Sequence, residues 1–504
     1  MTGKYLTRLL LLMLCCGVAG PAHTAGDSAI RVSLENASTN HGGVFEGWGT
    51  SLCWWANRLG YSDTLSQQAA DLFYGDNGLR LNIMRYNISG GDDPTHSHIT
   101  RTDSAVPGWM KWDEAQQRYV YDYTADHNQL NVMLRAVKAA GENALVEVFS
   151  NSPPYFMTVS GCSSGGKDPV SNNLREDCYT EFAEYLVHVT DYIQRELGVT
   201  VASLSPMNEP NTNYWHYFSD KQEGCHFDAG AEQSRIIEEV AAALGRYGIT
   251  NVLISASDET SPDKQLEAWH AYSEAARAAI GRMNTHSYSV DGIHELGRLV
   301  REQNLHLWMS EVDGSDTAGQ NAGEMGSALW FGQKIISDMN ALSPSAWVMW
   351  QVIDNHMSAQ GYHGNRDYGM VDVSHGFWGV AVADHDREEI ILTQKYYGMG
   401  QFTRYIRPGS TIIHCGSDAI AAYDPLKKEL VIVALNTSAN EREVAFDLSS
   451  FKAAGAAARA IRTSGSLADG EHWASLTDIP LTGKTLSAPL KGNSITTFLI
   501  SGVE

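Results

Sequence analysis

The sequence has few basic residues: its 36 Lys and Arg face 59 Asp and Glu, which gives a net charge of -23. A protein that binds nucleic acid needs a basic surface to replace the counterions of the phosphates, so this function is not expected. The same negative charge disfavours anionic membranes and polyanionic substrates. A neutral polymer is the partner that this composition accommodates most easily.

Long hydrophobic runs are also scarce. One lies at 9–18, behind Lys4 and Arg8, and small residues follow it up to Ala25. It is too short to span a bilayer and has the arrangement of a secretory signal, so we predict a signal peptide over 1–25 and a secreted or periplasmic protein. No later segment is apolar enough to cross a membrane, and we expect no membrane span.

Cysteine is rare as well, and five cysteines remain after the signal: Cys53, Cys162, Cys178, Cys225 and Cys415. An odd number leaves at least one unpaired or bridged to another chain. Cys162 and Cys178 bracket a Gly/Ser-rich loop and are the first choice for a disulfide, with Cys225 as a rival partner for either. None of the five has zinc-ligand spacing.

Histidines that could bind a metal are nearly absent from the predicted strand ends. His96 and His98, beside Asp92 and Asp93, resemble metal ligands superficially. They lie in a polar loop, and no third residue follows at a spacing typical of metal ligands, so a solvated loop is the better interpretation. The sequence therefore predicts no metal and no other cofactor.

What the sequence does contain, from 44 to 402, is an alternation of short apolar runs with longer helical patterns. Helices between consecutive strands require a parallel sheet, and eight such units close it into a (β/α)8 TIM barrel. The expected strands lie at 44–52, 79–86, 144–150, 201–209, 252–256, 282–286, 305–311 and 346–351. The expected helices lie at 65–74, 127–140, 176–196, 229–247, 263–280, 292–303, 323–342 and 390–402.

The pattern changes at 403. From there to 504, short alternating runs separated by turns predict an antiparallel β-sandwich, with strands at 411–414, 420–423, 430–435, 443–448, 458–462 and 494–500. The segment 26–43 contains a similar run at 30–34, which we expect to add a strand to the sandwich. A sandwich with strands from both ends of the chain would be held in a fixed position against the barrel.

Two glutamates end predicted strands of the barrel. Glu209 ends strand four in S-L-S-P-M-N-E-P, and Glu311 ends strand seven after L-H-L-W-M-S. Active sites of these barrels lie at the carboxyl ends of the strands, so both carboxyls are expected in one cleft. A retaining glycosidase uses two carboxyls about 5 Å apart, where a repulsion of about 3 kcal/mol keeps one protonated and the other ionised. Glu209 suits the acid/base and Glu311 the nucleophile.

Polar residues at other strand ends could support this pair. Asn208 can donate an amide hydrogen bond to a sugar hydroxyl. Arg85, which ends strand two, needs acidic partners and could keep Glu311 ionised. After strand six, Tyr288 could hold the nucleophile through its hydroxyl, and His286 could line the cleft.

Aromatic residues are plentiful, with 13 Trp and 22 Tyr, although most of these rings are expected to be core. Trp350, at the end of strand eight, would form the floor under a sugar ring. Trp54 and Trp55 could do the same after strand one, although one of the two is expected to point into the core.

Five segments together resemble glycoside hydrolase family 30: G-W-G-T-S-L-C-W-W-A at 47–56, R-Y-N at 85–87, S-N-S-P-P-Y-F-M at 150–157, P-M-N-E-P at 206–210 and S-E-V-D-G at 310–314. The resemblance covers essentially the whole mature chain. It implies a barrel with a side sandwich, Glu209 as acid/base, Glu311 as nucleophile and Asn151 as a substrate-binding residue.

Within this family, G-T-S-L-x-W-W-A and the segment at 160–166 are similar to the endo-β-1,6-galactanase branch. The glucosylceramidase branch usually has an acid where this chain has Trp54, and the loops of the xylanase branch are built for uronic acid side groups. The resemblance therefore implies a β-1,6-linked galactan substrate, such as the side chains of arabinogalactan proteins, and we expect a monomer.

Three alternatives remain open from the sequence. The same machinery could act as a β-glucosidase or β-1,6-glucanase, or a barrel without activity could bind carbohydrate. A metal-dependent hydrolase is the third, and the lack of clustered His at strand ends disfavours it. Whether the cleft acts within a polymer or from one end is not determined by the sequence.

Overall fold

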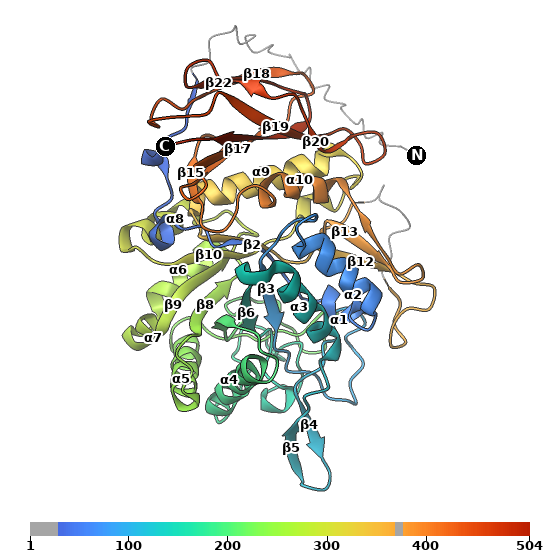
Figure 1. Ribbon diagram of the computed structural model, residues 1–504. Coiled ribbons are helices and arrows are strands. Elements are labelled where there is room, and N and C mark those ends of the chain that lie inside the picture. The colour runs from blue at the N-terminus through green and yellow to red at the C-terminus, as the bar shows by residue number, and fades with distance from the viewer. Residues whose placement is uncertain (1–28, 368–375) are drawn as a thin grey trace, which may run out of the picture.

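In the computed structural model, which describes residues 29–367 and 376–504, eight parallel strands close into a barrel (Figure 1). In pairing order they are β10 (Leu307–Glu311), β11 (Ala346–Met349), β2 (Gly47–Ser51), β3 (Ile83–Asn87), β6 (Leu145–Phe149), β7 (Val201–Ser205), β8 (Leu253–Glu259) and β9 (Ile280–His286). The predicted barrel is confirmed, and each predicted strand differs from the observed one by a few residues. The predicted signal peptide at 1–25 lies outside the described residues.

Helices surround the barrel: α1 (Trp55–Leu59), α2 (Asp63–Ala69), α3 (His127–Ala140), α4 (Tyr179–Arg195), α5 (Ala231–Tyr247), α6 (Pro262–Ala271), α7 (Glu274–Ala279), α8 (Ile293–Gln303), α9 (Met325–Leu342) and α10 (Gln394–Thr403). Each long helix buries one apolar stripe. In α4 the stripe contains Phe182, Leu186, Val189 and Ile193, whose three- and four-residue spacing places them on one face. None of the described helices is long and apolar enough to span a membrane.

Two predicted helices are wrong in detail. The helix expected over 263–280 divides into α6 and α7, because Tyr272 is extended and the Ser273 hydroxyl caps a new helix start by accepting from the N–H of Ala276. The segment expected as a helix over 390–402 begins with strand β14 (Glu389–Leu392), and α10 follows it. The β-branched Ile390 and Ile391 favour the extended form there.

Loops at the carboxyl ends of the strands carry elements that the sequence pattern did not predict. The connection from β3 to α3 contains a hairpin of β4 (Met110–Asp113) and β5 (Arg118–Tyr121), which projects from the barrel (Figure 1). The connection after β11 contains β12 (Ile353–Met357) and β13 (Ala381–Asp384), which form a small sheet with β14. These loops frame the end of the barrel where the two glutamates lie.

The carboxyl-terminal part is a two-sheet sandwich. One sheet contains β15 (Thr411–His414), β16 (Ala419–Asp424), β17 (Glu429–Asn436), β23 (Ser494–Ser501), β19 (Ala457–Ser464) and β20 (Glu471–Ser475), with β21 (Ile479–Pro480) beside β19. The other contains β1 (Ile30–Arg31), β18 (Arg442–Asp447) and β22 (Thr485–Leu490), and β1 pairs in parallel with β18. A strand from the N-terminal side of the barrel thus completes the sandwich, as expected. The short β20, β21 and β22 were not predicted.

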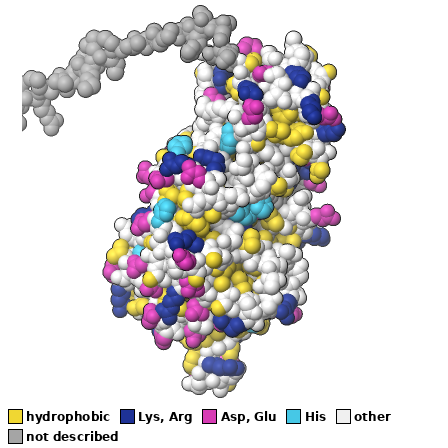
Figure 2. Space-filling view, turned by 90° about the vertical axis from the view of Figure 1, so that its left-hand side faces the viewer, with side chains coloured by type: hydrophobic (Ala, Val, Ile, Leu, Met, Phe, Trp, Pro, Cys, Tyr) yellow, Lys and Arg dark blue, Asp and Glu magenta, His cyan; other side chains and the backbone are white. Residues whose placement is uncertain are grey.

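The sandwich packs on α9 and α10, above the barrel in Figure 1. A Cβ added to Gly332 of α9 would lie 3.2 Å from Ile495 and 3.3 Å from Leu435 of the sandwich, so a glycine permits this close approach. Charged side chains of both signs are interspersed on the face shown in Figure 2. That face has no extended basic patch.

The predicted disulfide is not formed. All five cysteines of the described chain are buried and unpaired. The Cys162 Sγ faces Ser164 and His98, whereas the Cys178 Sγ faces Asp177. The two predicted partners therefore take part in different local contacts.

Candidate active site

The two predicted catalytic carboxyls lie together at the carboxyl end of the barrel. Glu311 is the last residue of β10, and Glu209 lies in the turn after β7. Glu209 has a left-handed backbone (φ 46°), and its N–H donates to the carbonyl oxygen of Asp258 at 2.9 Å. One carboxylate oxygen of Glu209 lies within 4.8 Å of one of Glu311. The side chains therefore share one pocket.

Each carboxyl has its own set of donors. The Tyr214 hydroxyl donates to Oε2 of Glu209 at 2.6 Å. Glu311 accepts from the Tyr288 hydroxyl at 3.1 Å and from Nη1 of Arg85 at 3.0 Å. Nδ1 of His286 lies 3.1 Å from Oε1 of Glu209 and 3.5 Å from Oε1 of Glu311, so this imidazole bridges the pair from inside the barrel.

A layer of buried charges lies beneath the pair. Arg85 contacts Glu147 and Asp258 as well as Glu311, and Arg282 contacts Glu147. These contacts follow from strand register, because Arg85 on β3 is opposite Glu147 on β6. Buried charges are tolerated only when they are paired in this way.

This layer sets the protonation of the pair. Although burial opposes it, the charges of Glu311 and Asp258 raise the pKa of His286 to about 10. A protonated His286 with Arg85 and Arg282 gives three positive charges, two of them balanced by Glu147 and Asp258. The third positive charge is neutralised when one carboxyl of the Glu209–Glu311 pair is ionised and the other is protonated.

Burial and the neighbouring charges act differently on the two carboxyls. Burial raises the pKa of Glu311 to about 7, and the Glu209 and Asp258 charges add to this effect. Burial also acts on Glu209, but the hydrogen bond and charge of His286 outweigh it and lower the pKa of Glu209.

Above the pair opens a pocket of about 340 Å³. Of the predicted site residues, Glu209, Glu311, Asn208, Tyr288, Trp54 and Trp350 line it. The rings of Trp54 and Trp350 meet edge to face at 4.8 Å. The buried Oδ1 of Asn208 has no hydrogen-bond partner among the described residues, so the amide can serve a ligand.

The structure does not place four of the predicted residues in the pocket wall. Arg85 and His286 are fully buried and reach the carboxyls from below. Asn151 is buried too, with its Nδ2 3.6 Å from Cys53 Sγ. Trp55 belongs to the core: its ring packs edge to face on Phe73, and its Nε1 donates to the Ser51 carbonyl.

Several residues of the site were missed by sequence reasoning. The pocket is also lined by Tyr214, Trp215, Trp378, Arg101, Lys221 and Asp313. Most of them lie in long loops, where no periodic pattern marks a side chain as inward. Glu147, inside the apolar strand L-V-E-V-F, and Asp258, near the end of β8, did carry a signal, because each is an acid in a buried strand.

His96 and His98 have a neighbour that the sequence spacing did not show. Besides Asp92, they have a partner distant in sequence, Cys162, and one donor atom from each of the four residues lies within 4.8 Å of the others. The sequence spacing did not reveal this group, because Cys162 comes from a different loop.

The fold and the paired carboxyls in an aromatic pocket define the class of protein as a glycoside hydrolase. A model of O-glycosyl hydrolase family 30 matches residues 29–277. The endo-β-1,6-galactanase of Hypocrea rufa is 29% identical over 489 residues, with 92% of this chain and 94% of that relative covered. The exo-β-1,6-galactobiohydrolase of Bifidobacterium longum subsp. longum is 26% identical, with 86% of this chain and 36% of that relative covered.

The fold is shared with solved structures. A conserved exported protein from Bacteroides fragilis superposes with a TM-score of 0.75 at 18% identity, covering 94% of this chain and 100% of that chain. The chain belongs to O-glycosyl hydrolase family 30, as its sequence motifs predicted.

Proposed function

We propose that this protein is a retaining hydrolase of β-1,6-linked galactan, such as the side chains of arabinogalactan proteins. The observation that carries the proposal is the approach of the two carboxyls to within 4.8 Å. An inverting enzyme holds them about 6.5–9.5 Å apart to admit a water molecule, whereas a retaining enzyme holds them about 5–5.5 Å apart. The substrate is inferred from the two relatives named for β-1,6-galactan.

In this proposal, Glu311 attacks the anomeric carbon while Glu209 protonates the leaving oxygen. A covalent glycosyl-enzyme forms, and Glu209 then deprotonates the water that hydrolyses it. Arg85 and Tyr288 both donate to Glu311, and both therefore favour the ionised nucleophile. Nδ1 of His286 faces both carboxyls, so the ionisation of one glutamate is linked to that of the other through this imidazole.

The roles can be tested with two alanine variants and sodium azide. Glu311→Ala should lower turnover by on the order of 10⁴-fold or more. Glu209→Ala should spare aryl galactosides with good leaving groups far more than the polymer, because these need less acid assistance. Azide should give the β-galactosyl azide with Glu209→Ala and the α-azide with Glu311→Ala. Equal losses on both substrates, or the opposite pattern of azides, would contradict the assignment.

The substrate is tested with purified polymers. Release of sugar from β-1,6-galactan should exceed release from β-1,6-glucan and from aryl glucosides, and the first product should keep the β configuration. A second pocket of about 500 Å³ shares Arg101, Lys221 and Trp378 with the catalytic pocket, so several sugar units can be bound. The sizes of the first products then separate cleavage within the chain from cleavage at one end.

We also propose that the protein is exported and acts as a monomer. The predicted signal over 1–25 supports export, and Edman sequencing of the mature protein should begin after that segment. Light scattering should give the mass of a single chain.

A further inference from the structure

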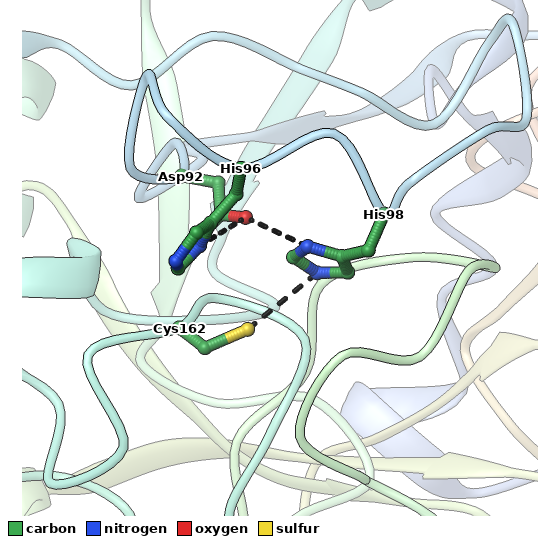
Figure 3. Close-up of side chains that lie close together, drawn as sticks. All are labelled: Asp92, His96, His98 and Cys162. Carbon is green, nitrogen blue, oxygen red and sulfur yellow. Dashed lines mark hydrogen bonds and ion pairs between the residues drawn. The ribbon is translucent and has the colours of Figure 1, made fainter.

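We propose that Asp92, His96, His98 and Cys162 bind one zinc ion that holds together the loops behind one wall of the catalytic pocket. The site is separate from the Glu209–Glu311 pair, and the ion would take no part in bond cleavage. The inference starts from a group of four donors that the fold brings together from two loops (Figure 3).

The geometry suits a small tetrahedral ion. Oδ2 of Asp92 lies 3.2 Å from Nδ1 of His96 and 3.4 Å from Nδ1 of His98, and Cys162 Sγ lies 3.5 Å from Nε2 of His98. With Zn–N and Zn–S bonds of about 2.1 and 2.3 Å, the donors of a tetrahedral site are separated by roughly 3.4–3.7 Å. His98 faces Asp92 and Cys162 with different nitrogens, so binding requires its ring to turn one nitrogen to the ion.

An unsatisfied atom points to a missing ligand. The His98 side chain is 8% exposed, and its Nδ1 lies 3.4 Å from Oδ2 of Asp92 without making a hydrogen bond to any described residue. Cys162 is fully buried. The ring of Phe218 lies against both imidazoles, with ring centroids 4.6 Å apart in each case, and covers one side of the group. A buried polar atom that makes no hydrogen bond is rare in native proteins, and an ion bound between this nitrogen and Asp92 would satisfy both groups.

The donor types select zinc. One thiolate, two imidazoles and one carboxylate form a set typical of zinc, whereas calcium and magnesium prefer oxygen donors. The second oxygen of Asp92 already accepts from the N–H of Ser163 at 3.0 Å, which fixes the carboxylate. Such outer contacts orient ligands at known metal sites.

The position of the group explains what the ion would do. Asp92 and both histidines lie in the loop after β3, and Cys162 lies in the loop after β6. Ser164, next to this group, donates to the carbonyl of His216 and accepts from the N–H of Ser219, which lines the catalytic pocket. An ion here would fix three loops at once and hold that pocket wall in place.

The proposal is tested by metal binding to the full-length mature protein, purified with reductant and stripped with a chelator. Titration with zinc chloride should show one bound ion per chain, with submicromolar affinity and a higher Tm. Cobalt(II) should give the near-ultraviolet band of a cobalt–thiolate bond. Cys162→Ser should remove this band, and His96→Gln should weaken zinc binding at least tenfold. The matched controls Cys225→Ser and His188→Gln should leave both unchanged.

Three results would overturn the proposal: no zinc bound by the folded wild-type protein at micromolar concentration, binding that survives both Cys162→Ser and His96→Gln, or Cys162 found in a disulfide by alkylation and mass spectrometry. The wild-type titration decides the matter even if a variant does not fold. Metal binding is measured without a glycoside, so its outcome is independent of the proposed galactanase activity.

Discussion

The inside of the barrel and the inside of the sandwich are built from different residue types. At the carboxyl end of the barrel, Arg85, Glu147, Asp258 and Arg282 are all buried and form ion pairs. The sandwich interior is an apolar cluster that includes Val32, Ile432, Phe446, Leu486 and Phe498. Burying ion pairs adds little net stability compared with apolar side chains of the same size. The charges are therefore best explained by the site they support.

The largest effect that would test this comparison is expected for Arg85→Met. It leaves Glu147, Asp258 and Glu311 without their shared cation, so we expect a loss of about 3–5 kcal/mol in the free energy of unfolding and loss of nearly all turnover. Denaturant unfolding and galactan hydrolysis measure the two. Arg298→Met, which removes an exposed pair with Glu295, should cost less than about 1 kcal/mol. A stable, active Arg85→Met would contradict the role given to the buried layer.

The sandwich should respond in stability alone. Phe498 is fully buried on β23 and packs against Phe446, with ring centroids 6.2 Å apart. Phe498→Ala should cost about 3–5 kcal/mol through lost burial and the cavity it leaves. Below its Tm the variant should keep the wild-type kcat/KM, because the cluster contributes no residue to the pocket. A lower kcat/KM in the fully folded variant would show that the two interiors are coupled.

The sequence predicted the elements whose pattern repeats. Each barrel strand is a short apolar run, and Glu209 and Glu311 could be placed because each ends such a run. The pocket wall was predicted less completely, since Trp378 and Lys221 come from loops without periodicity. The group around His98 was missed because its fourth member, Cys162, is brought close only by tertiary packing.

At two places the local sequence could not determine side-chain direction: it left open which of two tryptophans enters the core, and it favoured a disulfide that is not formed. Trp54 and Trp55 are adjacent and of one type, yet helix α1 turns Trp55 into the core while Trp54 lines the pocket. Cys162 and Cys178 bracket a loop, as disulfides often do, but their side chains face different neighbours. In both cases the outcome depends on the direction in which the side chain points, and the linear sequence pattern does not encode that direction.

A third test concerns the stability that is lost by burying an acidic side chain, Glu259, near the carboxyl end of the barrel strands. Burial, with the Glu209 charge adding to it, raises the pKa of Glu259 to about 8. The folded protein then holds a proton that the unfolded chain releases above about pH 4.5, so the contribution of Glu259 to stability falls from there to about pH 8 and is constant above. Glu259→Gln should reduce the slope of stability against pH by the part due to this one proton, worth roughly 3 kcal/mol at pH 7, while Asp126 and Glu223, whose pKa values burial raises to about 7, keep their own parts. A loss of stability from the amide that does not depend on pH would leave the slope of stability against pH unaffected. The control variant Glu302→Gln, which changes an exposed acid, should keep the wild-type slope.

The smallest expected effect comes from removing one hydroxyl at the catalytic pair, that of Tyr288. Tyr288 donates to Oε1 of Glu311 at 3.1 Å, so Tyr288→Phe removes a donor that stabilises the anion. The pKa of Glu311 should rise, so the limb of the kcat/KM profile on which Glu311 loses its proton should move to higher pH, while the limb set by Glu209 should stay in place.

We expect kcat to fall by about tenfold as well, since one donor to the nucleophile is lost. His286, with its pKa at about 10, stays protonated through both limbs, so the movement reports on the glutamates. Tyr423→Phe removes a hydroxyl that donates to the Val503 carbonyl in the sandwich and should leave the profile in place. A profile that stays fixed or moves downward with Tyr288→Phe would mean that this hydroxyl does not stabilise an ionised Glu311.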